Sequence, residues 1–95
     1  MLLSEQQILD RLQSAKDWNL DGKKICRTIV FKDFVRAMGF VQSVALFAEK
    51  ADHHPDIDIR WNSVTLVLST HSAGGLTEKD FSLAVQINSL ITSQV

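Results

Sequence analysis

The three histidines of this chain, His53, His54 and His71, fall inside one window of 19 residues. Imidazole gains or loses a proton near neutral pH, so a histidine cluster is where general acid–base chemistry is expected first. The simpler alternative is that adjacent histidines before Pro55 only mark a loop or the end of a helix. Spacing alone favours neither interpretation.

The window has the pattern of a β-hairpin, with Asn62-Ser63 as a two-residue turn. Counting outward from that turn pairs apolar residues with each other: Trp61 with Val64, Ile59 with Leu66, and Ile57 with Leu68. The same register places His54 opposite His71, and directly paired residues have Cβ atoms about 5 Å apart. The predicted hairpin therefore brings two imidazoles together, with His53 beside them.

A zinc site is the competing functional interpretation. It needs three or four ligands that converge at about 2 Å from the metal. Neighbouring side chains on an extended segment point to opposite faces, so His53 and His54 are poorly placed to share one ion with His71. Cys26 is the only cysteine, so no cysteine pair exists at metal-site spacing. We therefore expect no metal in the site.

The composition is that of one small globular domain, residues 1–95, with 45% hydrophobic residues. The net charge is −1, from 10 basic and 11 acidic residues, and no basic block predicts direct binding to nucleic acid. A single cysteine fits a reducing compartment. The first residues lack a signal-peptide pattern and no apolar run has the length of a membrane span, so we expect a soluble, cytoplasmic protein.

Seven elements are predicted, each bounded by a capping, turn or periodicity signal. They are a helix over 5–15, a short strand near Trp18, a strand over 24–31, a helix over 32–51, the two strands of the hairpin, and a helix over 78–91. Ser4 and Gln7 form a capping-box pattern before the first helix, and Thr77 caps the last one. This order predicts an α+β domain, a four-stranded antiparallel sheet with three helices on one face.

The helix over 32–51 is apolar on more than one side. One stripe at helical spacing is expected to face the core: Phe34, Val35, Met38, Val41, Val44, Ala45 and Ala48. Phe40 and Phe47 form a second cluster, seven residues apart. Either the core-facing stripe is broad, or the second cluster is buried against another copy of the chain, which predicts a homo-oligomer, dimer or tetramer.

The histidine window and its surroundings resemble the pterin-4a-carbinolamine dehydratases, a family also described as the dimerisation cofactor of a homeodomain transcription factor. The family signature is matched by residues at fixed gaps: Glu49, His53, His54, Pro55, Trp61, His71 and Asp80. The Ser-Thr-His run and its glycine-rich exit, residues 69–75, match as well. Ile57 and Ile59 stand where the family more often has aromatic residues.

The resemblance implies a hydro-lyase that removes water from 4a-hydroxytetrahydropterin to give quinonoid dihydropterin, which recycles the pterin cofactor of aromatic amino acid hydroxylases. Water loss changes no oxidation state, so no metal, nucleotide or redox cofactor is implied. One acid and one base, each contributing about 10²–10⁴-fold, suit this chemistry. The alternative is a non-enzymatic interaction or coactivator module on the same fold.

The resemblance also implies roles in catalysis. His53 and His71 are implied as the proton-transfer residues and His54 as a substrate contact or orienting residue, whereas the hairpin register by itself favours His54. Glu49 is expected either to fix an imidazole tautomer or to be a solvated helix end. Asp80, three residues after Thr77, is expected foremost as a capping-box carboxylate, with a supporting role in the site as the alternative.

Substrate contacts are implied for the three histidines and for residues beside them: Pro55, Trp61, Thr70, Ser72 and Ala73. Trp61 is expected in the core or in the wall of the cleft. The segment 70–73 leaves the second hairpin strand beside the histidines, so its backbone groups are expected to bind the flat edge of the pterin.

Overall fold

The computed structural model describes residues 1–94 and has the predicted order of elements, with one added 3₁₀ turn. The elements are α1 (Glu5–Ser14), β1 (Asn19–Asp21), β2 (Lys24–Val30), α2 (Phe34–Ala51), β3 (Asp56–Arg60), β4 (Ser63–Leu68), η1 (His71–Ala73) and α3 (Glu78–Gln94). The strands form one antiparallel sheet in the order β1-β2-β4-β3. The predicted α+β fold class is confirmed.

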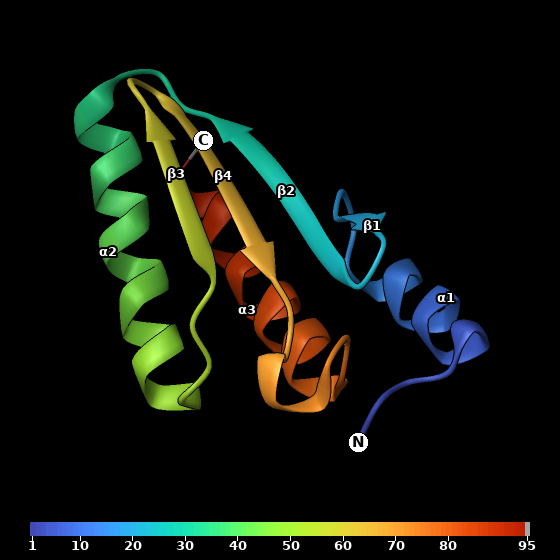
Figure 1. The fold of residues 1–95 in the computed structure, drawn as a ribbon. Coiled ribbons are helices and arrows are strands. Elements are labelled where there is room, and N and C mark those ends of the chain that lie inside the picture. The colour runs from blue at the N-terminus through green and yellow to red at the C-terminus, as the bar shows by residue number, and fades with distance from the viewer. Residues whose placement is uncertain (95) are drawn as a thin grey trace.

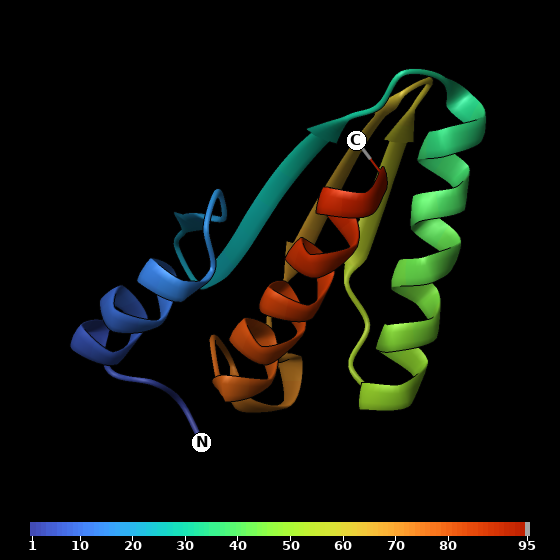
Figure 2. The same cartoon turned by 180° about the vertical axis from the view of Figure 1, so that it is seen from behind.

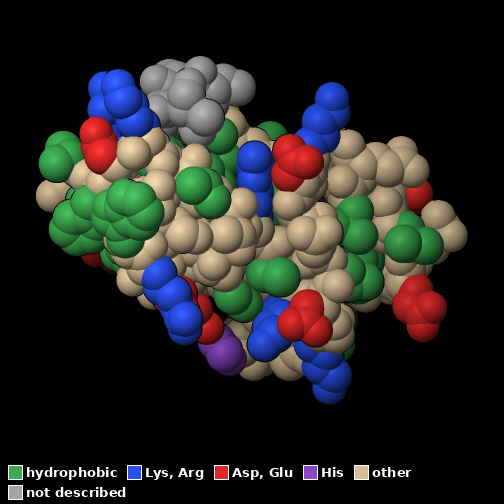
Figure 3. All heavy atoms as spheres, turned by 90° about the horizontal axis from the view of Figure 1, so that it is seen from above, with side chains coloured by type: hydrophobic (Ala, Val, Ile, Leu, Met, Phe, Trp, Pro, Cys, Tyr) green, Lys and Arg blue, Asp and Glu red, His purple; other side chains and the backbone are tan. Residues whose placement is uncertain are grey.

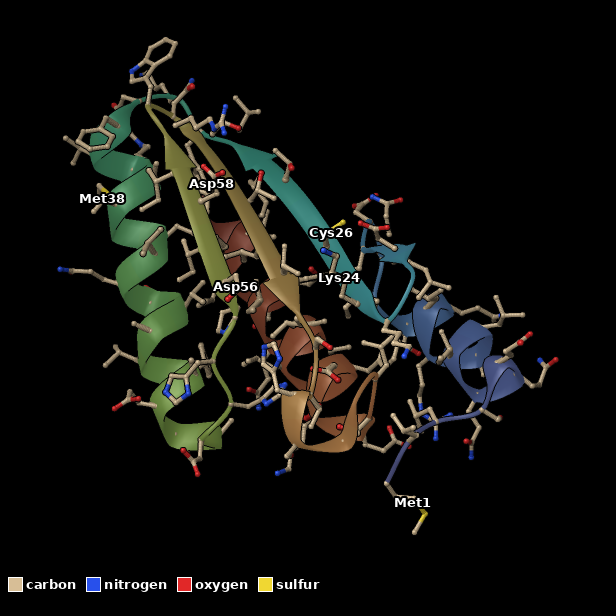
Figure 4. The ribbon with its side chains drawn as sticks, in the orientation of Figure 1. Met1, Lys24, Cys26, Met38, Asp56 and Asp58 are labelled. Carbon is tan, nitrogen blue, oxygen red and sulfur yellow. The ribbon has the colours of Figure 1, made fainter. Side chains whose placement is uncertain are left out.

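The helices lie on one side of the sheet, with α2 and α3 next to each other and α1 beyond the β1 end (Figures 1 and 2). Alternate residues of the two central strands point to that side and are buried: Ile25, Ile29, Val64, Leu66 and Leu68. The other face of the sheet carries Lys24 and Cys26 on β2 and Asp56 and Asp58 on β3, and Figure 4 shows these side chains on the uncovered face. The period-2 alternation of a one-sided sheet is therefore followed.

Local capping signals place α1 as predicted. Ser4 Oγ accepts from the Gln7 N–H at 3.2 Å, and Gln7 Oε1 accepts from the Ser4 N–H at 2.8 Å, so the capping box is complete. Arg11 of α1 forms an ion pair with Glu78 at the start of α3. That contact ties α1 to the helix that carries Asp80.

The predicted orientation of α2 is correct only in part: Val44 and Ala48 of the core-facing stripe are buried and Val41 packs against the core, but the second cluster, Phe40 and Phe47, faces the core too. Phe40 is fully buried and packs against the Phe31 ring at a centroid distance of 4.9 Å, together with Ala37, Val44 and Ala48. Phe47 is partly buried against the same core. Of the stripe expected to face inward, Phe34, Val35 and Met38 are exposed, and Leu46, which was not part of that stripe, is exposed as well. The helix is apolar over more than half of its circumference, so the pattern did not decide which side is buried.

The exposed residues define a surface that we call the α2 patch: Phe34, Val35, Met38 and Leu46. Hydrophobic side chains gather at the end of the molecule where α2 begins, seen at the left of Figure 3. Figure 4 shows Met38 pointing away from the sheet. Among the described residues, none of the helices combines the length and apolar character needed to cross a bilayer. The cytoplasmic location stays a prediction.

Candidate active site

The histidines meet where two connections, from α2 to β3 and from β4 to α3, lie at one end of the sheet. Helix α2 ends at Ala51 and is capped by Asp52, whose φ of +50° turns the chain, and the His53 N–H still bonds the Ala48 carbonyl at 3.1 Å. Residues 53–55 then lead into β3, while His71 opens η1 directly after β4. In Figure 1 the end of α2 and the η1 segment both lie at the lower end of the sheet. The site is therefore built on loops held by a helix end and two strands.

The hairpin register differs from the predicted one by two residues. Ile59 pairs with Val64 and Ile57 with Leu66, so the two-residue turn is Trp61-Asn62 and not Asn62-Ser63. Asn62 is fixed in the turn by Phe31, because its Nδ2 donates to the Phe31 carbonyl at 2.8 Å and its own carbonyl accepts from the Phe31 N–H at 2.8 Å. A shift of two keeps every side chain on its face, so the apolar pattern could not distinguish the two registers.

The histidines nevertheless come together, although not as a cross-strand pair. Strand β3 begins only at Asp56, which pairs with Val67, so His54 lies outside the ladder and does not face His71 across it. All three histidines line one open cleft of about 390 Å³. Its remaining lining residues are Asp52, Ser69, Thr70, Ser72 and Lys79. Tertiary packing of the two connections, and not the register, gathers the imidazoles.

His53 is the most buried of the three and pairs with a buried carboxylate. Its Nε2 lies 2.6 Å from Asp80 Oδ1, with 11% of the His53 side chain and none of the Asp80 side chain exposed. The other carboxylate oxygen, Oδ2, accepts from the Thr77 N–H at 2.9 Å and from the Thr70 hydroxyl at 2.8 Å. Asp80 is thus the capping carboxylate that the sequence predicted, and the same group also orients His53.

His54 and His71 are held differently. His54 Nε2 lies 2.5 Å from Glu49 Oε2, with both side chains mostly exposed, so Glu49 orients His54 and not the more buried His53. The His71 ring is exposed at the start of η1 and has no hydrogen-bond partner within residues 1–94. The two adjacent histidines diverge as expected, His53 toward α3 and His54 toward solvent.

The structure sorts the predicted substrate contacts into two groups. Those that line the cleft are His53, His54, Thr70, His71 and Ser72, whereas Pro55 and Ala73 lie outside its lining. The expectation that Trp61 belongs to the core or the cleft wall is wrong: its side chain is 71% exposed at the hairpin turn, the far end of β3. Its φ of +53° places it in the turn itself, where no core surrounds it.

The main-chain N–H of Thr70 is not free for the predicted contact with the edge of the pterin. Its N–H donates to the Gly75 carbonyl at 2.9 Å, and its own carbonyl accepts from the N–H groups of Ala73 and Gly74, at 3.0 Å each. Thr70 therefore offers no free main-chain N–H to a ligand. Its side chain instead points to Asp80.

Lysines in the site were not singled out from the sequence. Lys79 lines the cleft, and Lys23 and Lys24 line an adjoining recess of about 190 Å³ that also contains His54 and His71. Each lysine is an ordinary charged residue of a turn, a strand or a first helical turn, so no pattern indicated it.

In the part of the chain that the structure describes, no group of three His, Cys, Asp or Glu side chains is arranged to hold a metal ion. The absence of a metal stays a prediction.

Fold and site together define a class of protein, a small α+β domain with a buried His–Asp pair and two further imidazoles around an open cleft. The family described as pterin 4 alpha carbinolamine dehydratase matches residues 1–90. The chain belongs to this family, as the histidine signature predicted.

Similar proteins agree with this assignment over nearly the whole chain. A protein of Nocardia farcinica assigned as a pterin-4-alpha-carbinolamine dehydratase is 54% identical over 89 residues, covering 94% of each chain. One of Chloroflexus aurantiacus with the same assignment is 52% identical over 89 residues, covering 94% of this chain and 96% of its own. The dehydratase activity predicted from the sequence agrees with these names.

A solved structure from Brucella melitensis supports the fold. It is described as a transcriptional coactivator/pterin dehydratase, is 39% identical, and superposes with a TM-score of 0.90 over 95% of this chain and 98% of its own. A pterin dehydratase-like protein described as a RuBisCO assembly factor has a TM-score of 0.68 at 20% identity, covering 81% of this chain and 92% of its own. At that identity the likeness shows the fold alone.

Proposed function

We propose that this protein removes water from 4a-hydroxytetrahydropterin and so returns the pterin cofactor of aromatic amino acid hydroxylases to its quinonoid dihydro form. The observation that carries the proposal is the His53–Asp80 pair beside His54 and His71 in one cleft. Family membership supports the substrate class.

The chemistry needs two proton transfers and no change of oxidation state. The C4a–O bond breaks and the hydroxyl leaves as water after it gains a proton. The N5–H bond breaks and its electron pair forms the N5=C4a double bond, while the proton passes to a base. A pair of imidazoles can serve both steps because each titrates near neutral pH.

Our proposal gives these steps to His53 and His71. His53 donates its Nε2–H to the Asp80 carboxylate, which leaves Nδ1 as the lone-pair nitrogen of the neutral ring. After the ring takes the N5 proton, the adjacent carboxylate balances its positive charge. His71 is exposed at the cleft and exchanges protons with solvent, which suits the acid that protonates the leaving hydroxyl. His54, held by Glu49, orients the substrate.

The test is turnover of the carbinolamine, generated by a hydroxylase during the assay and compared with its spontaneous dehydration. His53→Ala and His71→Ala are each expected to lose about 10²-fold or more in kcat. If the two act as one unit, the double variant is little worse than the worse single variant. Asp58→Asn is the control, since Asp58 lies on the uncovered face of the sheet, outside the cleft, and its exposed pair with Arg60 contributes little. Wild-type turnover at the buffer rate would contradict the proposal.

We also propose that the chain forms a homo-oligomer, dimer or tetramer, through the α2 patch and not through Phe40 and Phe47. Val35 and Leu46 of this patch are 78% and 74% exposed. Hydrophobic side chains gather at this end of the molecule in Figure 3, and apolar side chains gathered on a surface mark an interaction site. Direct binding of nucleic acid is not part of the proposal, because the net charge is −1 and no basic block is present.

Light scattering tests this assembly. The wild type should have at least twice the chain mass of 10.7 kDa. Val35→Asp combined with Met38→Asp should lower the mass to that of one chain while far-UV circular dichroism is unchanged. Val30→Asp is the matched control, because Val30 is exposed on the uncovered face of the sheet. A monomeric wild type would contradict the homo-oligomer. The α2 patch would then be a surface for a different protein, as in the alternative interaction or coactivator module.

A further inference from the structure

The side chains of Thr70 and Thr77 form a buried hydrogen-bonded chain behind the His53–Asp80 pair. Thr70, Thr77 and Asp80 are 7%, 6% and 0% exposed. Thr70 Oγ1 lies 2.9 Å from Thr77 Oγ1 and 2.8 Å from Asp80 Oδ2. Thr77 Oγ1 also accepts from the Lys79 N–H at 3.3 Å. These hydrogen bonds thus connect the first turn of α3, through the Asp80 carboxylate, to the His53 imidazole.

The donor and acceptor capacities fix the direction of every bond in this chain. An ionised carboxylate only accepts, so the Thr70 hydroxyl proton must go to Asp80 Oδ2. Thr70 Oγ1 is then the acceptor for the Thr77 hydroxyl proton, and Thr77 Oγ1 accepts from the main chain. Asp80 Oδ1 is left to accept from the Nε2–H of His53. With Asp80 ionised, the assignment that satisfies all these groups puts the His53 proton on Nε2.

We propose that Thr70 and Thr77 are positioning residues that set the tautomer and orientation of His53 through the carboxylate of Asp80. Without the Thr70 hydroxyl, Oδ2 keeps only the Thr77 N–H, and the carboxylate can turn about its bond to Cβ. A carboxylate that turns no longer holds Oδ1 opposite Nε2, so the His53 ring loses its fixed partner. The effect on turnover rests on the proposed function, whereas the effect on the His53 ring does not.

A purely structural role is the alternative, because the same bonds join the η1 turn to the start of α3. The two roles differ in what they change. A structural role changes stability and leaves the protonated nitrogen of His53 as it was. A positioning role changes the nuclear magnetic resonance signals of the ring nitrogens in a protein that is still folded.

The experiment compares Thr70→Val, which keeps the shape and removes the hydroxyl, with Thr70→Ser, which keeps the hydroxyl. Thr65→Val is the matched control, since Thr65 forms a similar 2.8 Å pair with Thr28 on the uncovered face of the sheet, away from any histidine. Ring ¹⁵N shifts and the Nε2–H proton resonance of His53 are recorded for each folded variant, and kcat and KM are measured in parallel.

We expect one His53 tautomer with a protected Nε2–H in the wild type, in Thr70→Ser and in Thr65→Val. In Thr70→Val we expect the Nε2–H signal to be lost by exchange, the nitrogen shifts to average between tautomers, and kcat to fall about 10-fold with KM little changed. Thr77→Val should give a smaller change in the same direction, because it removes only the support of Thr70. Unchanged His53 signals in folded Thr70→Val would overturn the inference.

The outcomes separate this inference from the proposed function. Altered His53 signals in Thr70→Val support the positioning role even if the wild type has no dehydratase activity, a result that would refute the proposed function alone. If Thr70→Val does not fold, Thr77→Val supplies the same test, and unchanged ring signals there count against the inference.

Discussion

Replacing Asp80 by asparagine is expected to reverse the tautomer of His53. The oxygen Oδ2 accepts from two donors, and one of them, the Thr77 N–H, cannot reverse its direction. The amide oxygen of the variant must therefore take the place of Oδ2, which puts the amide NH₂ opposite His53 Nε2, at the position of the oxygen that lies 2.6 Å away in the wild type. A donor at that place requires an acceptor, so the His53 proton moves to Nδ1.

The expected loss of kcat follows from the functions that the His53 ring loses when its proton moves to Nδ1. With the proton on Nδ1, the lone pair of the neutral ring faces the introduced amide and not the substrate, and the charge that balances the protonated ring is gone. General acid–base catalysis by one positioned group contributes about 10²–10⁴-fold, so kcat should fall by at least about 10²-fold. The fold should survive, because every hydrogen-bonding atom of the network still has a partner.

The assay pairs turnover with ring ¹⁵N shifts of His53 in the Asp80→Asn variant, and Asp58→Asn is the control because it makes the same change at an exposed carboxylate outside the cleft. The expected result is a folded protein with Nδ1 protonated and kcat lowered at least about 10²-fold. A reversed tautomer with kcat within about threefold of the wild type would refute the reasoning, since one positioned base is worth far more than that and His53 would then not transfer a proton. A tautomer that stays on Nε2 would refute the assignment of the hydrogen bonds.

Three further outcomes are expected. Phe40→Ala should lower the free energy of unfolding by about 3–5 kcal/mol in denaturant titration, against less than about 0.5 kcal/mol for the exposed control Val30→Ala; equal losses would contradict the observed orientation of α2. The hydrogen bond from Arg11 lowers the pKa of Glu78 below its ordinary 4.5, so this ion pair stabilises the fold above that pH and the contribution disappears as the pH falls through the lowered value. The Tm difference between wild type and Glu78→Gln should accordingly shrink from pH 7 to pH 3, and a constant difference would speak against the pair. Active protein should contain well below one equivalent of zinc and keep its turnover in chelator; loss in chelator with recovery on adding a metal would overturn the metal-free site.

Local signals in the sequence determined the elements and part of the site. Ser4 with Gln7 and Thr77 with Asp80 are capping patterns three residues apart, and such contacts form within one turn wherever the helix lies. The period-2 alternation of β2 likewise agrees with the burial of Ile25 and Ile29 and the exposure of Thr28 and Val30. The clustering of all three histidines in one window made an acid–base site the natural interpretation of the sequence alone.

Only the tertiary structure decided how these elements face one another. The hairpin register depended on the bonds between Asn62 and Phe31, 31 residues apart, because a shift of two residues leaves the apolar pattern intact. The buried side of α2 depended on the ring of Phe31 meeting Phe40, because most of the helix circumference is apolar. The pair of His53 with Asp80 joins residues 27 apart in sequence, and only the packing of α3 against the end of α2 brings that carboxylate to the imidazole.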